Sequence, residues 1–243
     1  MAKLRVLCLH GFTTNGAVLA EQTGHLTKAL SSDFEFIFPD GPHEVDISAQ
    51  EDMSSPQSQR YSKWVCSKSP AGHRAWWYAR DPNPAANEEG HFEGLERSLE
   101  YLGDLMRRTG PFDVILGFSQ GGCFSGLLTA LLEEKNKKHP LRSKFPKSQG
   151  TLKAALSFSG FKPRFQQYDG IYAHGIDTQT LHVMGEKDLV VTVERSEVLA
   201  GLCRGAKVLK FEGGHQIPQG EEQSQTVIQF LRGISASLDK PAL

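Results

Sequence analysis

The chain has 243 residues, of which 39% are hydrophobic and 23% charged, and its net charge is −1. This length can bury a full core, so we expect one domain covering residues 1–243. The balanced charge offers no attraction for nucleic acid, and no apolar run reaches the roughly 18 residues of a membrane-spanning helix. No secretory signal is recognisable, and the four cysteines form no C-x-x-C pair of the kind that binds zinc. We therefore expect a cytoplasmic protein that uses no metal or cofactor and binds neither nucleic acid nor a membrane.

Short apolar runs alternate with segments of helical periodicity along most of the chain. The predicted strands are residues 4–9, 34–38, 114–116, 152–158, 180–184 and 206–211. The predicted helices are residues 17–30, 91–108, 123–134, 193–203 and 221–238. The basic residues within 135–147 are interpreted as a solvated surface loop. The alternation is typical of an α/β protein with a mainly parallel, doubly wound sheet and helices on both faces, in which ligands bind beyond the carboxyl ends of the strands.

An irregular insertion is predicted at about residues 41–90, where the alternation stops. This segment contains five of the prolines and shows no sustained period. All three tryptophans, Trp64, Trp76 and Trp77, lie in it. Because aromatic side chains carry a large apolar area, we expect the insertion to pack onto the rest of the protein. Two roles for these aromatic residues are open from the sequence, namely anchoring the insertion and lining a pocket.

The most informative motif is Gly117-Phe118-Ser119-Gln120-Gly121, which lies between a predicted strand and a predicted helix. In this G-x-S-x-G pattern a sharp turn holds the serine in a strained backbone conformation, and side chains two residues before and after it would collide with neighbouring backbone. The turn exposes the serine hydroxyl and places the next N–H group at a helix N-terminus. Ser119 is therefore the candidate nucleophile.

A serine nucleophile needs a base, and His215 is the candidate. In folds that carry this turn the chain order is serine, acid, histidine, so only histidines after Ser119 qualify. His215 alone among them follows a predicted strand on a glycine-rich loop. The alternatives are a histidine in the basic loop, one in an irregular stretch and one within a strand: His139, His174 and His182.

The acid that orients the base is expected between Ser119 and His215. Asp188 directly follows a predicted strand, from which it can reach the Nδ1 atom of His215. Its rivals are Glu186 and Asp177. A structural role for Asp188 as a turn or helix-capping residue is the alternative interpretation.

Acyl transfer also needs two N–H donors for the oxyanion of the tetrahedral intermediate. The N–H group of Gln120 is one candidate. The second is expected in the loop after the first strand, where Gly11 allows close approach, and Phe12 is preferred over Thr13 there.

Seven segments of the chain together resemble the FSH1 family of serine hydrolases. They are LRVLCLHGFTTN, RAWW, GPFDVILGFSQGG, LSFSGF, LHVMGEKDLVV, ERSEVLA and FEGGHQIP, spread over nearly the full length in the family's order. The resemblance implies an α/β-hydrolase fold, a triad of Ser119, Asp188 and His215, and an oxyanion hole at Phe12 and Gln120. It also implies the activity of a carboxylesterase or thioesterase, which in some fungal members releases acyl or polyketide chains from a carrier protein. Gly122 departs from the alanine common in the family.

We therefore expect a hydrolase of acyl esters or thioesters that works through an acyl-enzyme, with a small-molecule substrate or an acyl carrier protein as its partner. Thr13, Trp76 and Trp77 are candidate substrate contacts. Two other functions are weighed against this one. The first is a binding module whose triad is vestigial, and the second is an acyltransferase that passes the acyl group to an alcohol or amine.

Overall fold

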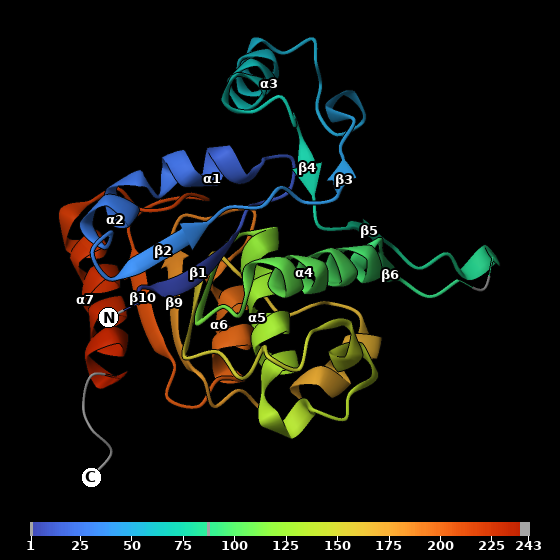
Figure 1. Cartoon of the computed structure of the whole chain (residues 1–243). Coiled ribbons are helices and arrows are strands. Elements are labelled where there is room, and N and C mark those ends of the chain that lie inside the picture. The colour runs from blue at the N-terminus through green and yellow to red at the C-terminus, as the bar shows by residue number, and fades with distance from the viewer. Residues whose placement is uncertain (1, 87, 239–243) are drawn as a thin grey trace.

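The computed structural model describes residues 2–86 and 88–238, and a six-stranded sheet lies at its centre (Figure 1). The strand order is β10-β9-β8-β7-β1-β2, and every neighbouring pair is parallel. The strands are β1 (Leu4–Leu9), β2 (Phe34–Ile37), β7 (Val114–Phe118), β8 (Ala154–Phe158), β9 (Gln179–Gly185) and β10 (Lys207–Phe211). The structure thus confirms the predicted α/β class with a parallel sheet.

Helices cover both faces of this sheet. One face carries α1 (Gly16–Gln22), α2 (Gly24–Ala29) and α7 (Glu221–Leu238), and the other carries α4 (Leu95–Thr109), α5 (Gln120–Leu132) and α6 (Val193–Gly201). Every residue of β7 and of β8 is buried, as expected for central strands between two helical layers. The apolar cores on the two faces draw alternate residues from the same strands, such as Val6 and Leu7 of β1.

The strand order reverses direction between β1 and β7. From β1 the chain moves outward to β2, whereas from β7 it proceeds the other way through β8, β9 and β10. The loops after β1 and β7 therefore separate at this point and leave a crevice at the carboxyl end of the sheet. This topology places the segment after Leu9 beside the turn at Ser119.

Two predicted helices differ from the structure in their extent. Residues 17–30 form two helices, because the hydroxyl of Thr23 donates to the carbonyl of Leu19 and the chain turns before α2. The first residues of the predicted helix 91–108 form a strand, β6 (His91–Glu93), and α4 begins after Gly94, whose φ of 85° is readily adopted only by glycine.

The insertion at residues 41–90 is more regular than predicted. It contains a helix, α3 (Pro56–Lys68), and the strands β3 (His43–Glu44), β4 (Arg74–Ala75) and β5 (Tyr78–Arg80), with β3 paired to β4 and β5 to β6. Figure 1 shows α3 standing beyond the sheet, joined to it through β3 and β4. Only Ser58 and Val65 of α3 are buried, so no apolar stripe marked this helix in the sequence.

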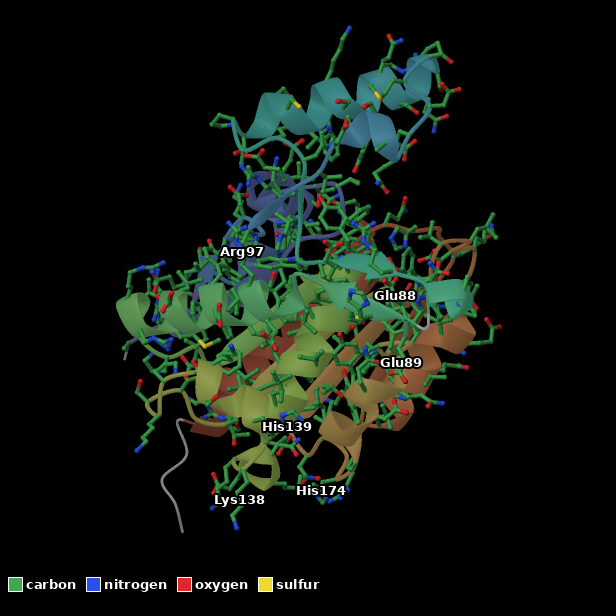
Figure 2. All side chains as sticks on the ribbon, turned by 90° about the vertical axis from the view of Figure 1, so that its right-hand side faces the viewer. Glu88, Glu89, Arg97, Lys138, His139 and His174 are labelled. Carbon is green, nitrogen blue, oxygen red and sulfur yellow. The ribbon has the colours of Figure 1, made fainter. Side chains whose placement is uncertain are left out.

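The basic segment after α5 lies far from the insertion. It forms two short 3₁₀ turns, Glu134–Asn136 and Pro140–Lys144. In Figure 2, Lys138 and His139 lie with His174 at the end of the molecule opposite α3. In the part of the chain that the structure describes, no helix has the length and apolar character needed to cross a membrane.

Two buried histidines predict a loss of stability in weak acid. Burial lowers the pKa of His10 and of His182 from 6.5 to about 4, so both stay neutral in the folded protein while they become protonated in the unfolded chain. Because the unfolded state binds more protons between these two values, the free energy of unfolding falls as the pH decreases from 6.5 to 4. Each histidine contributes at most about 1.4 kcal/mol per pH unit to that slope.

Urea unfolding at a series of pH values measures the slope. We expect His182→Leu to reduce it by about 1 kcal/mol per pH unit, since one of the two proton sites is gone. His174→Leu, a change at an exposed position, is the matched control and should leave the slope unaltered. An unchanged slope in His182→Leu would contradict the assignment of a neutral buried imidazole.

Candidate active site

The turn at Ser119 has the strained geometry that the glycine spacing predicted. Ser119 has φ 55° and ψ −115°, a conformation that L-residues rarely adopt. A Cβ atom added to Gly117 would lie 2.0 Å from the carbonyl oxygen of Gly121, and one added to Gly121 would lie 1.9 Å from the carbonyl oxygen of Leu9. Both positions therefore require glycine.

Gly122, which departs from the family pattern, is also closely surrounded by backbone atoms at the end of β8 and in the loop after it. A Cβ atom there would be 2.8 Å from the Cα atom of Gly160 and 2.9 Å from the carbonyl oxygen of Phe158. The missing methyl group lets the first turn of α5 approach the loop after β8 closely. Glycine at this position therefore permits close packing of the two segments, and an alanine would force the loop to shift.

The structure brings Ser119, His215 and Asp188 together at the carboxyl end of the sheet. The hydroxyl of Ser119 lies 2.9 Å from Nε2 of His215, and Nδ1 of His215 lies 2.7 Å from Oδ2 of Asp188. Each side chain extends from a loop that directly follows a strand, β7 for Ser119, β9 for Asp188 and β10 for His215. The His215 ring also packs against Phe118, with 4.9 Å between the ring centroids.

The carboxylate of Asp188 is buried, and both of its oxygen atoms accept hydrogen bonds. Its Oδ1 atom accepts hydrogen bonds from the N–H groups of Val190 and Val191 at 2.9 and 2.8 Å. Burial alone would raise the pKa of Asp188, but the hydrogen bonds from His215 and Val191 outweigh it, and the pKa lies below its usual value. An ionised Asp188 holds the proton of His215 on Nδ1 and leaves Nε2 free to accept the proton of Ser119.

The rival acids and histidines from the sequence lie elsewhere. Glu186 is exposed, and Asp177 forms ion pairs with Lys135 and Arg204 at 2.7 and 2.8 Å. Of the rival histidines, His139 and His174 lie at the end of the molecule opposite α3 (Figure 2). The third, His182, lies within β9. Within residues 2–86 and 88–238, no group of three His, Cys, Asp or Glu side chains is arranged to hold a metal ion.

Two cavities open beside Ser119. The first, of about 390 Å³, has Gln120 and the side chains of several aromatic residues in its wall: Phe12, Trp77, Tyr78, Phe92 and Phe161. The second, of about 470 Å³, is lined by His215, by Thr13 and by Tyr61 and Trp64 of α3. Phe12, Gln50, Ser119 and Val190 line both cavities. A substrate bound across the serine would therefore extend into two separate spaces.

The two candidate oxyanion donors border the first cavity. Gln120 is the first residue of α5, so its N–H group has no carbonyl one turn before it in the helix. Across the described residues, neither this group nor the N–H of Phe12 donates to another protein atom. Phe12 and Gln120 line the cavity together with Ser119, whereas Thr13 lines only the second cavity. This arrangement favours Phe12 over Thr13 as the second donor.

The side chain of Gln120 fixes the insertion to the turn. Its Oε1 atom accepts the N–H of Trp76, and its Nε2 atom donates to the carbonyl of Trp77, both at 2.8 Å. Trp76 is fully buried, its Nε1 atom donates to the carbonyl of His10, and it lines neither cavity. The ring of Trp76 therefore anchors the insertion, and neither cavity supports its predicted contact with the substrate. Trp77 lines the first cavity and Thr13 the second, so their roles as substrate contacts stay predictions.

Five further lining residues were not among the candidate substrate contacts from the sequence. Arg80, Arg164 and Arg195 line the first cavity, and Tyr61 and Trp64 line the second. The arginines come from three distant segments, so no local spacing connects them. Of these five, Trp64 alone had a signal, as one of the three tryptophans within the insertion.

Comparison with known proteins identifies similar serine hydrolases and esterases. Residues 1–227 match the family described as "Serine hydrolase (FSH1)". Esterase OVCA2 from Danio rerio is 33% identical over 234 residues, which cover 94% of this chain and 96% of the relative. Esterase OVCA2 from Homo sapiens is 34% identical over 232 residues, covering 94% and 95%.

Solved structures of low sequence identity share the fold. Esterase PE8 superposes with a TM-score of 0.58 at 24% identity, covering 96% of this chain and 93% of that one. Zea mays acyl-protein thioesterase 2 superposes with a TM-score of 0.60 at 16% identity, covering 97% and 95%. Together with the parallel sheet and the serine turn, these similarities confirm the predicted α/β-hydrolase fold.

Removal of the Gln120 side chain should destabilise the protein. Gln120→Ala leaves the buried N–H of Trp76 and the carbonyl of Trp77 without partners, and we expect the free energy of unfolding to fall by about 2–5 kcal/mol. Urea unfolding at pH 7 measures this loss. Gln229→Ala, at an exposed position of α7, is the control and should change stability by less than about 0.5 kcal/mol. Equal stability of the two variants would show that the side chain does not hold the insertion.

Proposed function

The chain belongs to the FSH1 family of serine hydrolases, and on that basis we propose that it hydrolyses acyl esters through an acyl-enzyme formed on Ser119. The observation that carries this proposal is the continuous hydrogen-bonded chain from Ser119 through His215 to Asp188, with links of 2.9 and 2.7 Å. Such a chain converts a poor nucleophile into an effective one by giving its proton a destination.

In the first step, the oxygen of Ser119 attacks the ester carbonyl while Nε2 of His215 takes its proton. The resulting imidazolium carries its second proton on Nδ1, where the ionised Asp188 accepts the hydrogen bond and stabilises the charge. The carbonyl oxygen becomes an oxyanion, for which the N–H groups of Phe12 and Gln120 are the proposed donors. The N–H of Gln120 at the start of α5 adds the favourable field of a helix N-terminus.

Collapse of the intermediate releases the alcohol. His215 gives its proton to the departing oxygen, and the acyl group stays bound to Ser119 as an ester. Water then attacks this ester while Nε2 of His215 takes its proton, and as the bond between the acyl carbon and the Ser119 oxygen breaks, His215 returns that proton to Ser119 and the carboxylic acid leaves. Every proton in this sequence passes through Nε2 of His215.

Activity-based labelling tests the proposal. A fluorophosphonate forms a covalent bond with an activated serine, so we expect it to label the wild-type chain and not Ser119→Ala. With phenyl butanoate as substrate, Ser119→Ala and His215→Ala should each lower kcat by at least about 10⁴-fold, and Asp188→Asn by about 10⁴-fold. The folded state of each variant is verified by circular dichroism.

Alanine substitution of an exposed serine, Ser237→Ala, is the matched control and should keep full labelling. Equal labelling of the wild type and Ser119→Ala would contradict the assignment of the nucleophile. Tight ligand binding without any turnover would identify a binding module, and transfer of the acyl group to an added alcohol in preference to water would identify an acyltransferase.

A further inference from the structure

The two cavities beside Ser119 receive different halves of the substrate, if the proposed function holds. His215 lines only the second cavity, and Gln120 lines only the first. Because Nε2 of His215 must protonate the departing oxygen, the alcohol half has to lie on the side of His215. The second cavity therefore holds the leaving group, and the first holds the acyl group. We refer to the first as the acyl cavity.

The acyl cavity carries positive charge without compensating acids in its wall. Arg80, Arg164 and Arg195 line it, and none of the described residues in its lining is Asp or Glu. The second cavity has the opposite character, since Glu51 lines it and no lysine or arginine of the described chain does. This asymmetry favours an acyl half that is anionic and a leaving group that is not.

Two of the three arginines already have acidic partners outside the cavity wall. Arg80 pairs with Glu93, and Arg164 pairs with Asp81 at 2.5 Å. Their charge is partly neutralised by these partners, so they contribute less to the binding of an anion.

Arg195 has no acidic partner among the described residues. Its guanidinium lies over the ring of Phe161, 4.6 Å from the ring centroid, and Nη1 donates to the carbonyl of Val190 at 3.0 Å. These two contacts fix the orientation of the group and leave its other N–H donors available. A planar guanidinium held in this way is suited to bind a carboxylate with two parallel hydrogen bonds.

The rest of the acyl cavity is suited to an apolar chain. Four aromatic residues, Trp77, Tyr78, Phe92 and Phe161, line it together with Ser119 and the arginines. Neutral acyl chains would contact these rings but gain nothing from the unpaired charge of Arg195. A chain that ends in a carboxylate would use both.

From these observations we propose that the substrate is a monoester of a dicarboxylic acid: its acyl half carries a terminal carboxylate bound by Arg195, and its alcohol is uncharged. Arg195 is thus the residue that selects the acyl group. This inference rests on the proposed esterase function and adds the substrate class.

The experiment compares matched esters. Monophenyl adipate and monophenyl suberate carry a terminal carboxylate, and phenyl hexanoate and phenyl octanoate are neutral chains of similar length. We expect kcat/KM of the wild type to be about tenfold higher for the carboxylate esters, a modest preference because Arg195 is exposed to solvent. The preference should decrease as salt is added.

Variants of the arginines show which residue causes the preference for carboxylate esters. In Arg195→Gln, the ratio of kcat/KM for the carboxylate ester to that for the neutral ester should fall about tenfold, and Arg195→Lys should show an intermediate ratio. Arg164→Gln should lower the ratio less, because Asp81 already pairs with Arg164. Arg97→Gln is the control, since Arg97 is exposed on α4 outside both cavities (Figure 2) and its loss should leave the ratio unchanged.

The possible results separate the two proposals. Hydrolysis of the neutral esters with an equal or higher kcat/KM, and the same ratio in Arg195→Gln as in the wild type, would overturn the substrate class and leave the esterase function intact. A failure to hydrolyse any of the four esters, together with no fluorophosphonate labelling, would instead overturn the proposed function itself.

Discussion

The close contact between the start of α5 and the end of β1 is the constraint on which the site depends. With no side chain at Gly121, its Cα atom can approach the carbonyl of Leu9, and the absence of one at Gly117 lets the turn close behind Ser119. The backbones packed closely on either side of the turn hold Ser119 at its strained φ of 55°. The same contact puts the loop after β1, with Phe12, beside the N–H group of Gln120. One steric condition thus positions both the proposed nucleophile and the proposed oxyanion donors.

Burial has opposite consequences for the ionisable groups around this turn. Asp188 is buried but accepts hydrogen bonds at both oxygens, so it stays ionised and determines which nitrogen of His215 carries the proton. His10 is also buried, and burial lowers its pKa so that it stays neutral, with Nε2 accepting the N–H of Gly41 and Nδ1 donating to the carbonyl of Gly11. Asp188 therefore provides a negative charge at the site, whereas the neutral His10 only connects two loops through its hydrogen bonds.

The parts of this protein that follow from local spacing were predictable, and those that depend on distant contacts were not. Glycines two residues either side of Ser119, and strand ends at Asp188 and His215, predicted a geometry that the structure shows. Helix α3 begins with a favourable N-cap, Ser55, and a proline at its first position. It was missed because only two of its residues are buried, so the sequence shows no apolar stripe. Trp76 and Trp77 are neighbours with different environments, a difference set by contacts with Gln120 and His10 that lie more than 40 residues away in the chain.

The hydrogen bonds of Gln120 to the insertion involve only main-chain atoms of Trp76 and Trp77. Such an attachment specifies the path of the chain without specifying which side chains project from it. The residues that follow, Tyr78 to Arg80, can therefore be exchanged during evolution while the anchor and the turn at Ser119 are retained. A fold of this kind can acquire new acyl preferences by substitutions in one segment, with the catalytic geometry inherited unchanged.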